Sequence, residues 1–294
     1  MQNFESLKRS IESTRDLESV VRTMKTLAAV SIKQYEQAVD SLEHFSETVE
    51  QGIQMVLWDV QPGPILQEPQ ATGTTGIIIF GSDQGMCGQF NEQISSYTLE
   101  YLSNNLAENS KAAWLVIGSR ILGKLLDARV EVDFEYLLPG SATGIAPLVS
   151  EILASIDQWR TKRRLGRIYI FYNQRVTAST YKPHALQLLP IDSSRFFHQK
   201  NRIWTTRTLP AFTMNRNILL SRLIRQYLFV SLFRACAESL AGENASRIAS
   251  MQAAERNIKE RLVDLESEFN QQRQASITEE ILDVITGFEA LKDL

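Results

Sequence analysis

The stretch Gly-Ser-Asp-Gln-Gly-Met-Cys-Gly-Gln-Phe-Asn, residues 81–91, holds the residue types most able to do chemistry. It follows an apolar run at 74–80 and precedes a helix-forming segment, and a strand, a glycine-rich loop and a helix together can cradle a phosphate. A dinucleotide loop needs Gly-x-Gly-x-x-Gly, whereas Asp83 places a carboxylate where phosphate charge would be repelled. The Gly-Lys-Ser or Gly-Lys-Thr of a nucleoside triphosphate loop occurs nowhere in the chain. Both phosphate-binding interpretations therefore fail on residue identity.

Nucleophilic and metal chemistry are no better supported. Cys87 stands beside a predicted helix start, where the pKa of a thiol can fall, but the histidines that could activate it lie in no recognisable setting. A small buried thiol is the favoured interpretation of Cys87, and a metal cluster is poorly supported. A Ser-Asp pair in a loop more often caps the following helix or closes a turn. The three histidines of the chain are His44, His184 and His198. We therefore predict no catalytic residue, no cofactor and no metal site.

Composition indicates a globular protein with balanced charge. The 294 residues are 44% hydrophobic, and 31 basic against 34 acidic residues give a net charge of −3, so no general attraction to nucleic acid or an anionic membrane is expected. The N-terminal segment carries charges throughout, unlike a signal peptide, and no window reaches the roughly 18 apolar residues that span a bilayer. Two cysteines fit a reducing compartment. A cytoplasmic protein that meets membranes only through partners is predicted.

Proline positions divide the chain into three parts. All eight prolines lie between residues 62 and 210, and proline breaks helix interiors, so each flanking arm can form one continuous helix. We predict an N-terminal coiled-coil helix over 1–60, a central α/β domain over 74–190 and a C-terminal coiled-coil helix over 208–294. The arms flank a domain whose ends can then lie close together, which favours antiparallel pairing. Two separate amphipathic helices packed on the central domain are the alternative.

A strict seven-residue frame runs through the first arm. A repeat of 3.5 keeps one seam facing a partner helix, whereas a helix lying on a globular core drifts toward 3.6. At about 1.5 Å per residue, an arm of roughly 55 residues would extend on the order of 80 Å. Apolar residues fill twelve of the sixteen seam positions, and the four exceptions are Thr14, Glu18, Lys25 and Ser46. The twelve are Phe4, Leu7, Ile11, Val21, Ala28, Ile32, Tyr35, Val39, Leu42, Val49, Ile53 and Val56.

The central part alternates between strand-like and helix-like segments. Continuous apolar runs indicate buried strands, whereas alternating runs indicate edge strands, and Pro183 places its run at an edge. Buried strands are expected at 74–80, 112–118 and 166–173, edge strands at 130–137 and 181–190, and helices at about 91–105, 119–128 and 144–164. The predicted fold class is α/β: a long antiparallel coiled coil of the N- and C-terminal helices plus a central Rossmann-like domain with a mainly parallel sheet.

Four segments make the chain resemble the gamma subunit of F-type ATP synthases over nearly its whole length. VVRTMKTLAA at 20–29 resembles a family segment of the first arm, and SDQGMCGQFN at 82–91 resembles the family's S-D-x-G-L-C-G-x-[FL]-N. In the second arm, ESLAGENASRIASMQAAERN at 238–257 resembles a family block of small residues with a Glu and an Arg. RQASITEEILDVITGFEAL at 273–291 resembles the C-terminal signature, which is the most specific of the four.

The resemblance implies a central-stalk rotor subunit with no active site of its own. In that family the paired helices stand inside a ring of three alpha and three beta subunits, while the globular domain sits near the membrane on the ring of c subunits. Turning the rod couples ion flow to ATP synthesis or hydrolysis. The implied partners are the alpha, beta and epsilon subunits and the c ring, without a cofactor. The implied location is the cytoplasmic face of the bacterial inner membrane, as a peripheral protein.

The resemblance also implies two sets of beta-subunit contacts. The first-arm set would face the lever of the beta subunit, and the second-arm set would form a polar catch with beta-subunit loops. The apolar segment 281–291 fits a bearing contact. Exposed helix positions without a specific contact are the alternative for each residue. The residues concerned are Arg22, Met24 and Lys25 in the first arm and Arg273, Gln274, Thr278 and Glu280 in the second.

Some positions depart from the family pattern. Thr26 replaces the usual methionine and Ser31 the usual lysine, and such divergence would suit a sodium-linked F-type ATPase. Two other function classes stay open, a nucleotide-dependent enzyme built on the central domain and a coiled-coil scaffold unrelated to ATPases. ATP binding by the isolated chain would favour the first. Failure to assemble with alpha and beta subunits would favour the second.

Overall fold

Two long helices dominate the computed structural model. Helix α1 spans Gln2–Val56 and helix α6 spans Arg216–Lys292, and neither contains a proline. Contacts group the chain into two compact units, one of Met1–Leu27 with Ile248–Leu294, here the coil unit, and one of Ala28–Arg247, here the domain unit. The structure describes residues 2–57, 74–105, 111–163, 165–176, 180–191, 196 and 211–292.

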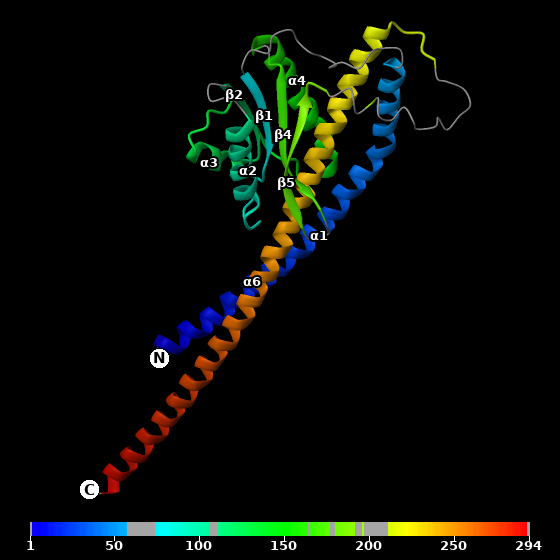
Figure 1. Ribbon diagram of the computed structural model, residues 1–294. Coiled ribbons are helices and arrows are strands. Elements are labelled where there is room, and N and C mark those ends of the chain that lie inside the picture. Colours follow the sequence, from blue (N-terminus) through cyan, green and yellow to red (C-terminus); the bar gives the residue numbers. More distant parts are fainter. Residues whose placement is uncertain are drawn as a thin grey trace. The chain divides into compact units, whose positions relative to one another are not determined.

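The domain unit is built on a five-stranded sheet with strand order β3-β2-β1-β4-β5 (Figure 1). The pairs β3–β2, β2–β1 and β1–β4 are parallel, whereas β5 pairs antiparallel with β4 at the edge. The predicted fold class is confirmed, and the run containing Pro183 is the predicted edge strand. The strands are β1 Thr74–Phe80, β2 Lys111–Ile117, β3 Phe134–Tyr136, β4 Arg167–Arg175 and β5 Tyr181–Leu189.

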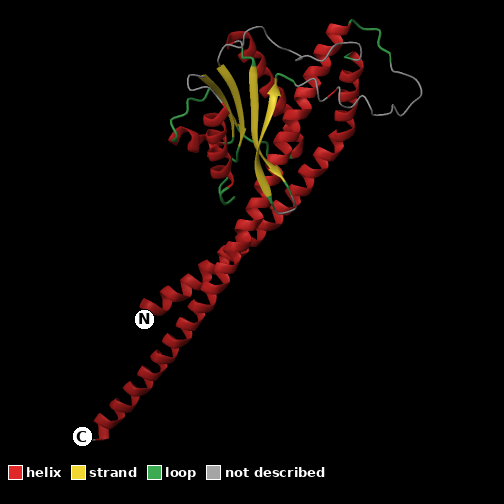
Figure 2. Cartoon of the chain, in the orientation of Figure 1, coloured by secondary structure: helices red, strands yellow, loops and turns green. Residues whose placement is uncertain are grey.

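Helices lie on both faces of the sheet (Figure 2). Alternate residues of the central strands supply two separate cores, one on each face. Ile77 and Ile79 of β1 face a cluster that includes α2 and α3, whereas Ile78 and Phe80 face α4 and the long helices. Helices on both faces bury the central strands, which explains why β1 is a continuous apolar run. The helices are α2 Phe90–Asn105, α3 Ser119–Asp127 and α4 Ile145–Arg163, with the short 3-10 turn η1 Ala142–Gly144 before α4.

In the coil unit, α1 and α6 pair through the predicted narrow seam. From Phe4 to Lys25 every predicted seam position of α1 is buried or half-buried. Met24 is the only other residue in this stretch that is not exposed. The rings of Phe4 and Phe269 stack 4.4 Å apart, and Lys25 lies 2.5 Å from Glu255, so the pairing is antiparallel. Heptad spacing recurs on α6, where buried or half-buried residues follow one another at alternating spacings of four and three. These residues are Met251, Glu255, Ile258, Leu262, Leu265, Phe269 and Gln272.

In the domain unit the same two helices bury a wider surface. Gly52 of α1 lets the side chain of Leu223 of α6 approach closely, because an added Cβ would lie 3.0 Å from it. Both helices also join the core that covers one face of the sheet. From residue 239 to 247 every residue of α6 is buried. The three-part division at 1–60, 74–190 and 208–294 stays a prediction, and residues 58–73 and 208–210 lie outside the described residues.

Candidate functional site

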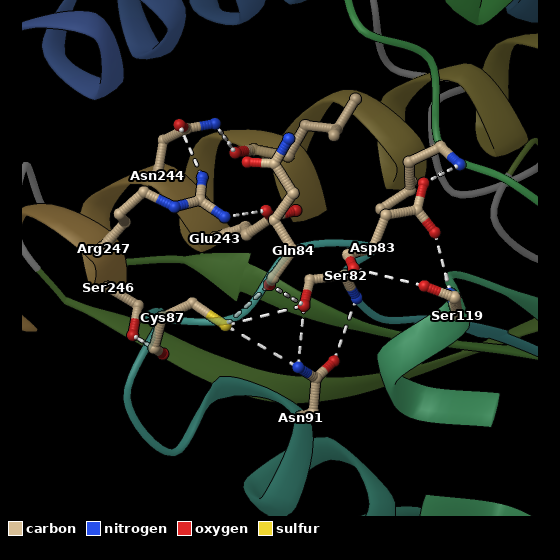
Figure 3. A network of polar contacts seen from close by, with 12 residues as sticks. Ser82, Asp83, Gln84, Cys87, Asn91, Ser119, Glu243, Asn244, Ser246 and Arg247 are labelled. Carbon is tan, nitrogen blue, oxygen red and sulfur yellow. Dashed lines mark hydrogen bonds and ion pairs between the residues drawn. The ribbon is translucent and has the colours of Figure 1, made fainter. Parts of the chain in front are cut away.

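The glycine-rich loop between β1 and α2 is held closed by its own side chains (Figure 3). Asn91, in the first turn of α2, accepts a hydrogen bond from the Ser82 N–H at 2.9 Å and donates one to the Ser82 hydroxyl at 2.7 Å. That hydroxyl donates to the Gln84 carbonyl oxygen at 2.9 Å. Gly88 adopts a left-handed φ of 58°, and a side chain at Gly81 would overlap α3. The glycines therefore serve a tight turn and close packing.

Asp83 caps a helix instead of meeting a ligand. One carboxylate oxygen accepts the Ser119 N–H at 2.8 Å, at the start of α3, and the other accepts the Leu138 N–H at 2.7 Å, just after β3. The sequence predicted that the Ser-Asp pair either caps the following helix, α2, or closes a turn, and the Ser82 hydroxyl does bond within the turn. The capped helix is α3, because the carboxyl ends of the parallel strands β1 and β2 meet at one edge of the sheet. The carboxylate thus occupies the helix end that a phosphate would use.

Helix α6 fills the crevice in which a doubly wound sheet binds its ligand. Strand order reverses between β1 and β4, and such sheets bind ligands beyond the carboxyl ends of the strands at this switch point. There the Ser246 hydroxyl donates to the Cys87 carbonyl oxygen at 2.5 Å and lies 3.1 Å from the Tyr181 hydroxyl. An added Cβ at Gly242 would lie 3.2 Å from the Asn173 carbonyl oxygen. The crevice is therefore a docking groove for the chain's own helix.

Glu243 and Arg247 form a buried ion pair one turn apart on α6. The Arg247 guanidinium lies 2.5 Å from a Glu243 carboxylate oxygen and donates to the Asn244 side-chain oxygen at 3.1 Å. Asn244 in turn donates to the Leu240 carbonyl oxygen at 2.8 Å. Burial raises the pKa of Glu243, and the Arg247 charge opposes that rise. A buried pair adds little net stability, but its bonds hold the side chains in one arrangement.

Cys87 is a packed thiol on the inner side of the loop. It is 3% exposed, and its sulfur lies 3.5 Å from the Ser82 hydroxyl oxygen. Burial raises the pKa of the thiol, which disfavours the reactive thiolate. The structure agrees with the interpretation of Cys87 as a small buried thiol. Cys236 is also fully buried, and burial raises its pKa in the same way.

The two described histidines, His44 and His184, lie on different elements. His44 is exposed on α1, 3.7 Å from Glu47, and His184 on β5 meets the ring of Tyr172 edge-on. His198 lies outside the described residues. Among the residues that the structure describes, no group of three or more His, Cys, Asp or Glu side chains could hold a metal ion. No described helix is long and apolar enough to cross a bilayer. The absence of a cofactor and a metal stays a prediction.

The first-arm residues expected to contact a beta subunit lie at the edge of the coil seam. Arg22 is exposed and lies 3.4 Å from Glu18, whereas Met24 is half-buried. Lys25 is directed across the seam, where its ammonium donates to Glu255 at 2.5 Å. The hydrogen bonds from Lys25 and Lys259 lower the pKa of Glu255 to about 2. Lys25 is thus already engaged within the coil unit, and its contact with a beta subunit stays a prediction.

The second-arm residues form a separate group. Arg273, Gln274, Thr278 and Glu280 are all exposed, and the Thr278 hydroxyl donates to the Gln274 carbonyl oxygen at 2.9 Å. Lys25 pairs with Glu255, which lies 18 residues before Arg273, so the two groups are about 27 Å apart along the coil. The structure does not bring them together. Sequence reasoning also missed the buried polar network on α6, for which the only signal was a Glu and an Arg four residues apart among small residues.

Comparison with known proteins places the chain in a family. The model of a family described as ATP synthase matches residues 3–291, which takes in both long helices and the sheet. The chain belongs to this ATP synthase family. The resemblance inferred from the four sequence segments is thereby confirmed, since all four lie within the matched residues.

Individual relatives of this ATP synthase family member are gamma chains. The ATP synthase gamma chain of Anaeromyxobacter sp. (strain K) is 25% identical over 301 residues, covering 99% of this chain and 100% of the relative. The ATP synthase gamma chain of Haemophilus influenzae (strain 86-028NP) is 27% identical over 299 residues, with the same coverage of both chains. The similarity therefore extends over the full length of both relatives.

Solved structures share the fold at low sequence identity. A chain of the Euglena gracilis mitochondrial ATP synthase rotor, in rotational state 1, matches with a TM-score of 0.63 and 15% identity, covering 94% of this chain and 99% of that chain. A chain from the OSCP/F1/c-ring structure of the same enzyme, in rotational state 3, matches with a TM-score of 0.64 and 15% identity, covering 99% of this chain and 95% of that chain. The arrangement of long helices around a central sheet is thus shared with rotor chains.

Proposed function

We propose that this chain is the gamma, central-stalk rotor subunit of an F-type ATP synthase. In this role it couples transmembrane ion flow to ATP synthesis or hydrolysis in the alpha and beta subunits and has no active site of its own. The observation that carries the proposal is the difference in burial between two segments of α6. One segment is buried in the domain unit, and another presents only exposed side chains in the coil unit.

The exposed end of α6 supplies the partner-facing surface. Residues 273–285 are exposed at every position, although large apolar side chains recur there at helical spacing. Ile281 and Val284 are 54% and 70% exposed, and Ile277, Leu282 and Ile285 beside them are also exposed. Contiguous exposed apolar surface marks a site of association. Apolar contacts are non-directional, so a bearing built from them in the alpha and beta subunits would hold the helix without favouring one angle.

The polar side chains beside this surface supply the contacts that depend on angle. Arg273, Gln274, Thr278 and Glu280 would meet beta-subunit loops in turn as the coil rotates. Their exposure supports this assignment, because each is free of the seam with α1. Arg22 and Met24 would face the beta-subunit lever higher on the coil. Lys25 would join them only by leaving Glu255, so its contact would be the weakest of the three.

The domain unit would make the contacts of this chain with the subunits nearest the membrane. We assign it contacts with the epsilon subunit and the ring of c subunits, which would place the chain on the cytoplasmic face of the bacterial inner membrane as a peripheral subunit. Nucleic acid is not an expected partner, given the net charge of −3. A sodium-linked complex stays a prediction from the divergent motif positions. The carboxylate pattern of the c subunit made by the same organism tests it.

Co-expression with the alpha and beta subunits of the same organism tests the proposed function. We expect a complex containing one copy of this chain, isolated by sizing, that hydrolyses ATP faster than the alpha and beta subunits alone. Failure to form a stoichiometric, active complex would contradict the rotor assignment and favour an unrelated scaffold. Calorimetry of the isolated chain with ATP separates the enzyme alternative, because micromolar binding or turnover would contradict a non-catalytic role.

A further inference from the structure

The most unusual segment of the molecule is the polar part of α6 that the domain unit encloses. Residues 239–247 are buried on every side of the helix, and five of the nine are polar or charged. Charged side chains are almost never fully buried unless they are paired. Glu243 is 5% and Arg247 7% exposed, even though a well-packed apolar segment would hold the helix equally tightly. Stability alone therefore does not explain why these polar residues are buried here.

Two other elements of the domain unit contact the segment, both through the Ser246 hydroxyl. This hydroxyl donates to the Cys87 carbonyl oxygen in the loop after β1 (Figure 3) and also lies 3.1 Å from the Tyr181 hydroxyl of β5. Burial raises the pKa of Tyr35 of α1, and the Glu243 charge adds to that rise. Ser246 thus links the enclosed helix to both the loop after β1 and strand β5.

These contacts are sensitive to rotation of the helix about its axis. Hydrogen bonds weaken steeply when their angle departs from linearity, whereas apolar contacts are non-directional. Turning α6 by one residue, about 100°, would carry the Ser246 hydroxyl away from the loop and put Ala245 or Arg247 in its place, and neither has a hydroxyl. The close approach at Gly242 has the same effect, because any residue with a Cβ turned into its place would crowd the Asn173 carbonyl oxygen.

We infer that Gly242 and Ser246 are positioning residues of a rotational lock, which prevents α6 from turning inside the domain unit when torque passes along it. The inference rests on the proposed rotor function. If α6 could turn freely inside the domain unit, ATP hydrolysis in the alpha and beta subunits would proceed without moving ions. The lock lies in the last turns of α6 before the helix continues from Arg247 into the coil unit.

A reversible disulfide can replace the lock. An added Cβ at Gly242 would lie 3.6 Å from the Cβ of Tyr181, within the roughly 3.5–4.5 Å that disulfides prefer. In the variant Tyr181→Cys/Gly242→Cys/Ser246→Ala, both hydrogen bonds of residue 246 are lost in the reduced state. The oxidised state ties α6 to β5 covalently. Peptide mapping by mass spectrometry would confirm that the bridge joins 181 and 242 and excludes the buried Cys87.

The assay uses the complete ATP synthase in membrane vesicles. ATP hydrolysis and ATP-driven membrane potential are measured on the same vesicles, so that their ratio reports coupling. For the reduced variant we expect hydrolysis to persist and the potential generated per ATP to fall by at least about fivefold, which is the equilibrium effect of losing one typical hydrogen bond. Oxidation should restore the ratio, and a reducing agent should lower it again.

Two controls isolate the lock. Tyr181→Cys/Ser246→Ala lacks the second cysteine, so its ratio should stay low after oxidation. Ser150→Ala removes an exposed hydroxyl that bonds only within α4, and its ratio should equal that of the wild type. An unchanged ratio in the reduced variant would overturn the lock. A low ratio that oxidation fails to restore, or a parallel loss of hydrolysis and assembled complex, would overturn it too. If the wild-type chain itself formed no coupled complex, the rotor function would fail instead.

Discussion

Helix α6 runs through two different environments, one in the domain unit and one in the coil unit. The difference between them separates a segment that fixes the helix in place from a segment that can slide against partners. In the domain unit its residues 239–247 are buried on all sides and carry a charged pair. In the coil unit only a seam of α6 is covered, by α1, and from Arg273 to Ile285 the helix is wholly exposed. The first segment makes directional polar contacts, and the second presents exposed apolar side chains. A shaft needs both, since one end must be fixed and the other must slide.

The largest effect is expected where the buried charges meet. Arg247→Leu would leave the Glu243 carboxylate buried without its partner, which costs about 3–5 kcal/mol in other buried pairs. Urea unfolding followed by tryptophan fluorescence checks it, because Trp114 and Trp159 are buried in the domain unit. Arg256→Leu is the matched control, on an exposed stretch of the same helix. Equal unfolding free energies for the two variants would show that the ion pair is not structural.

The next effect tests the seam of the coil unit. Leu265 is 3% exposed, so Leu265→Ala should cost about 2–4 kcal/mol through lost burial and a cavity. Val263→Ala, at a position 67% exposed, should stay within about 0.5 kcal/mol of the wild type. Thermal unfolding followed by circular dichroism at a helix wavelength measures both. A comparable loss for the two variants would mean that α1 covers a wider face of α6 than the heptad pattern indicates.

Acid should loosen the coil unit before the domain unit. The hydrogen bonds of Glu255 with Lys25 and Lys259 lower its pKa from 4.5 to about 2. A depressed pKa gives stability that is present above the unfolded value and is lost as pH falls from about 4.5 toward 2. We therefore expect the wild type to lose stability in this window and Glu255→Gln to lose less. Hydrogen exchange of seam amides across the pH series checks it. An identical pH dependence in the variant would contradict the assignment.

The smallest effect on the isolated chain is expected at the exposed end of α6. Gln274→Ala with Thr278→Ala removes side chains that touch only their own helix or solvent, so helicity should stay unchanged. The same variant should lower the ATPase activity of the assembled complex, if these residues meet beta-subunit loops. Circular dichroism and a coupled ATPase assay give the two readouts. Full ATPase activity in the variant would contradict the proposed contact of these residues with beta-subunit loops.

Local patterns predicted those parts of the fold that depend on local physics. The heptad frame found the seam of α1, including the polar positions Lys25 and Glu18, because a 3.5 repeat determines which face a partner covers. Pro183 predicted the edge strand, since proline cannot donate to a sheet ladder. The glycines of 81–91 predicted a turn. Each of these features depends on residues near one another in the chain.

Long-range contacts were beyond such patterns. The cap that Asp83 places on α3 depends on strand order, which brings residues 83 and 119 together. The burial of Arg247 depends on which elements surround α6, and the residue itself would suit an exposed helix face equally well. The separation of Arg22 from Arg273 depends on the stagger of the two helices, and a seven-residue repeat is compatible with several staggers.

Direct observation of rotation tests the central claim. The alpha and beta subunits of the complex are fixed to a surface, and a bead is attached to the domain unit through Ser103→Cys, an exposed position on α2; the native Cys87 and Cys236 are buried. On addition of ATP we predict that the bead turns in one direction, because the lock transmits the rotation of α6 to the domain unit. A bead that stays still while ATP is hydrolysed at the normal rate would contradict the account.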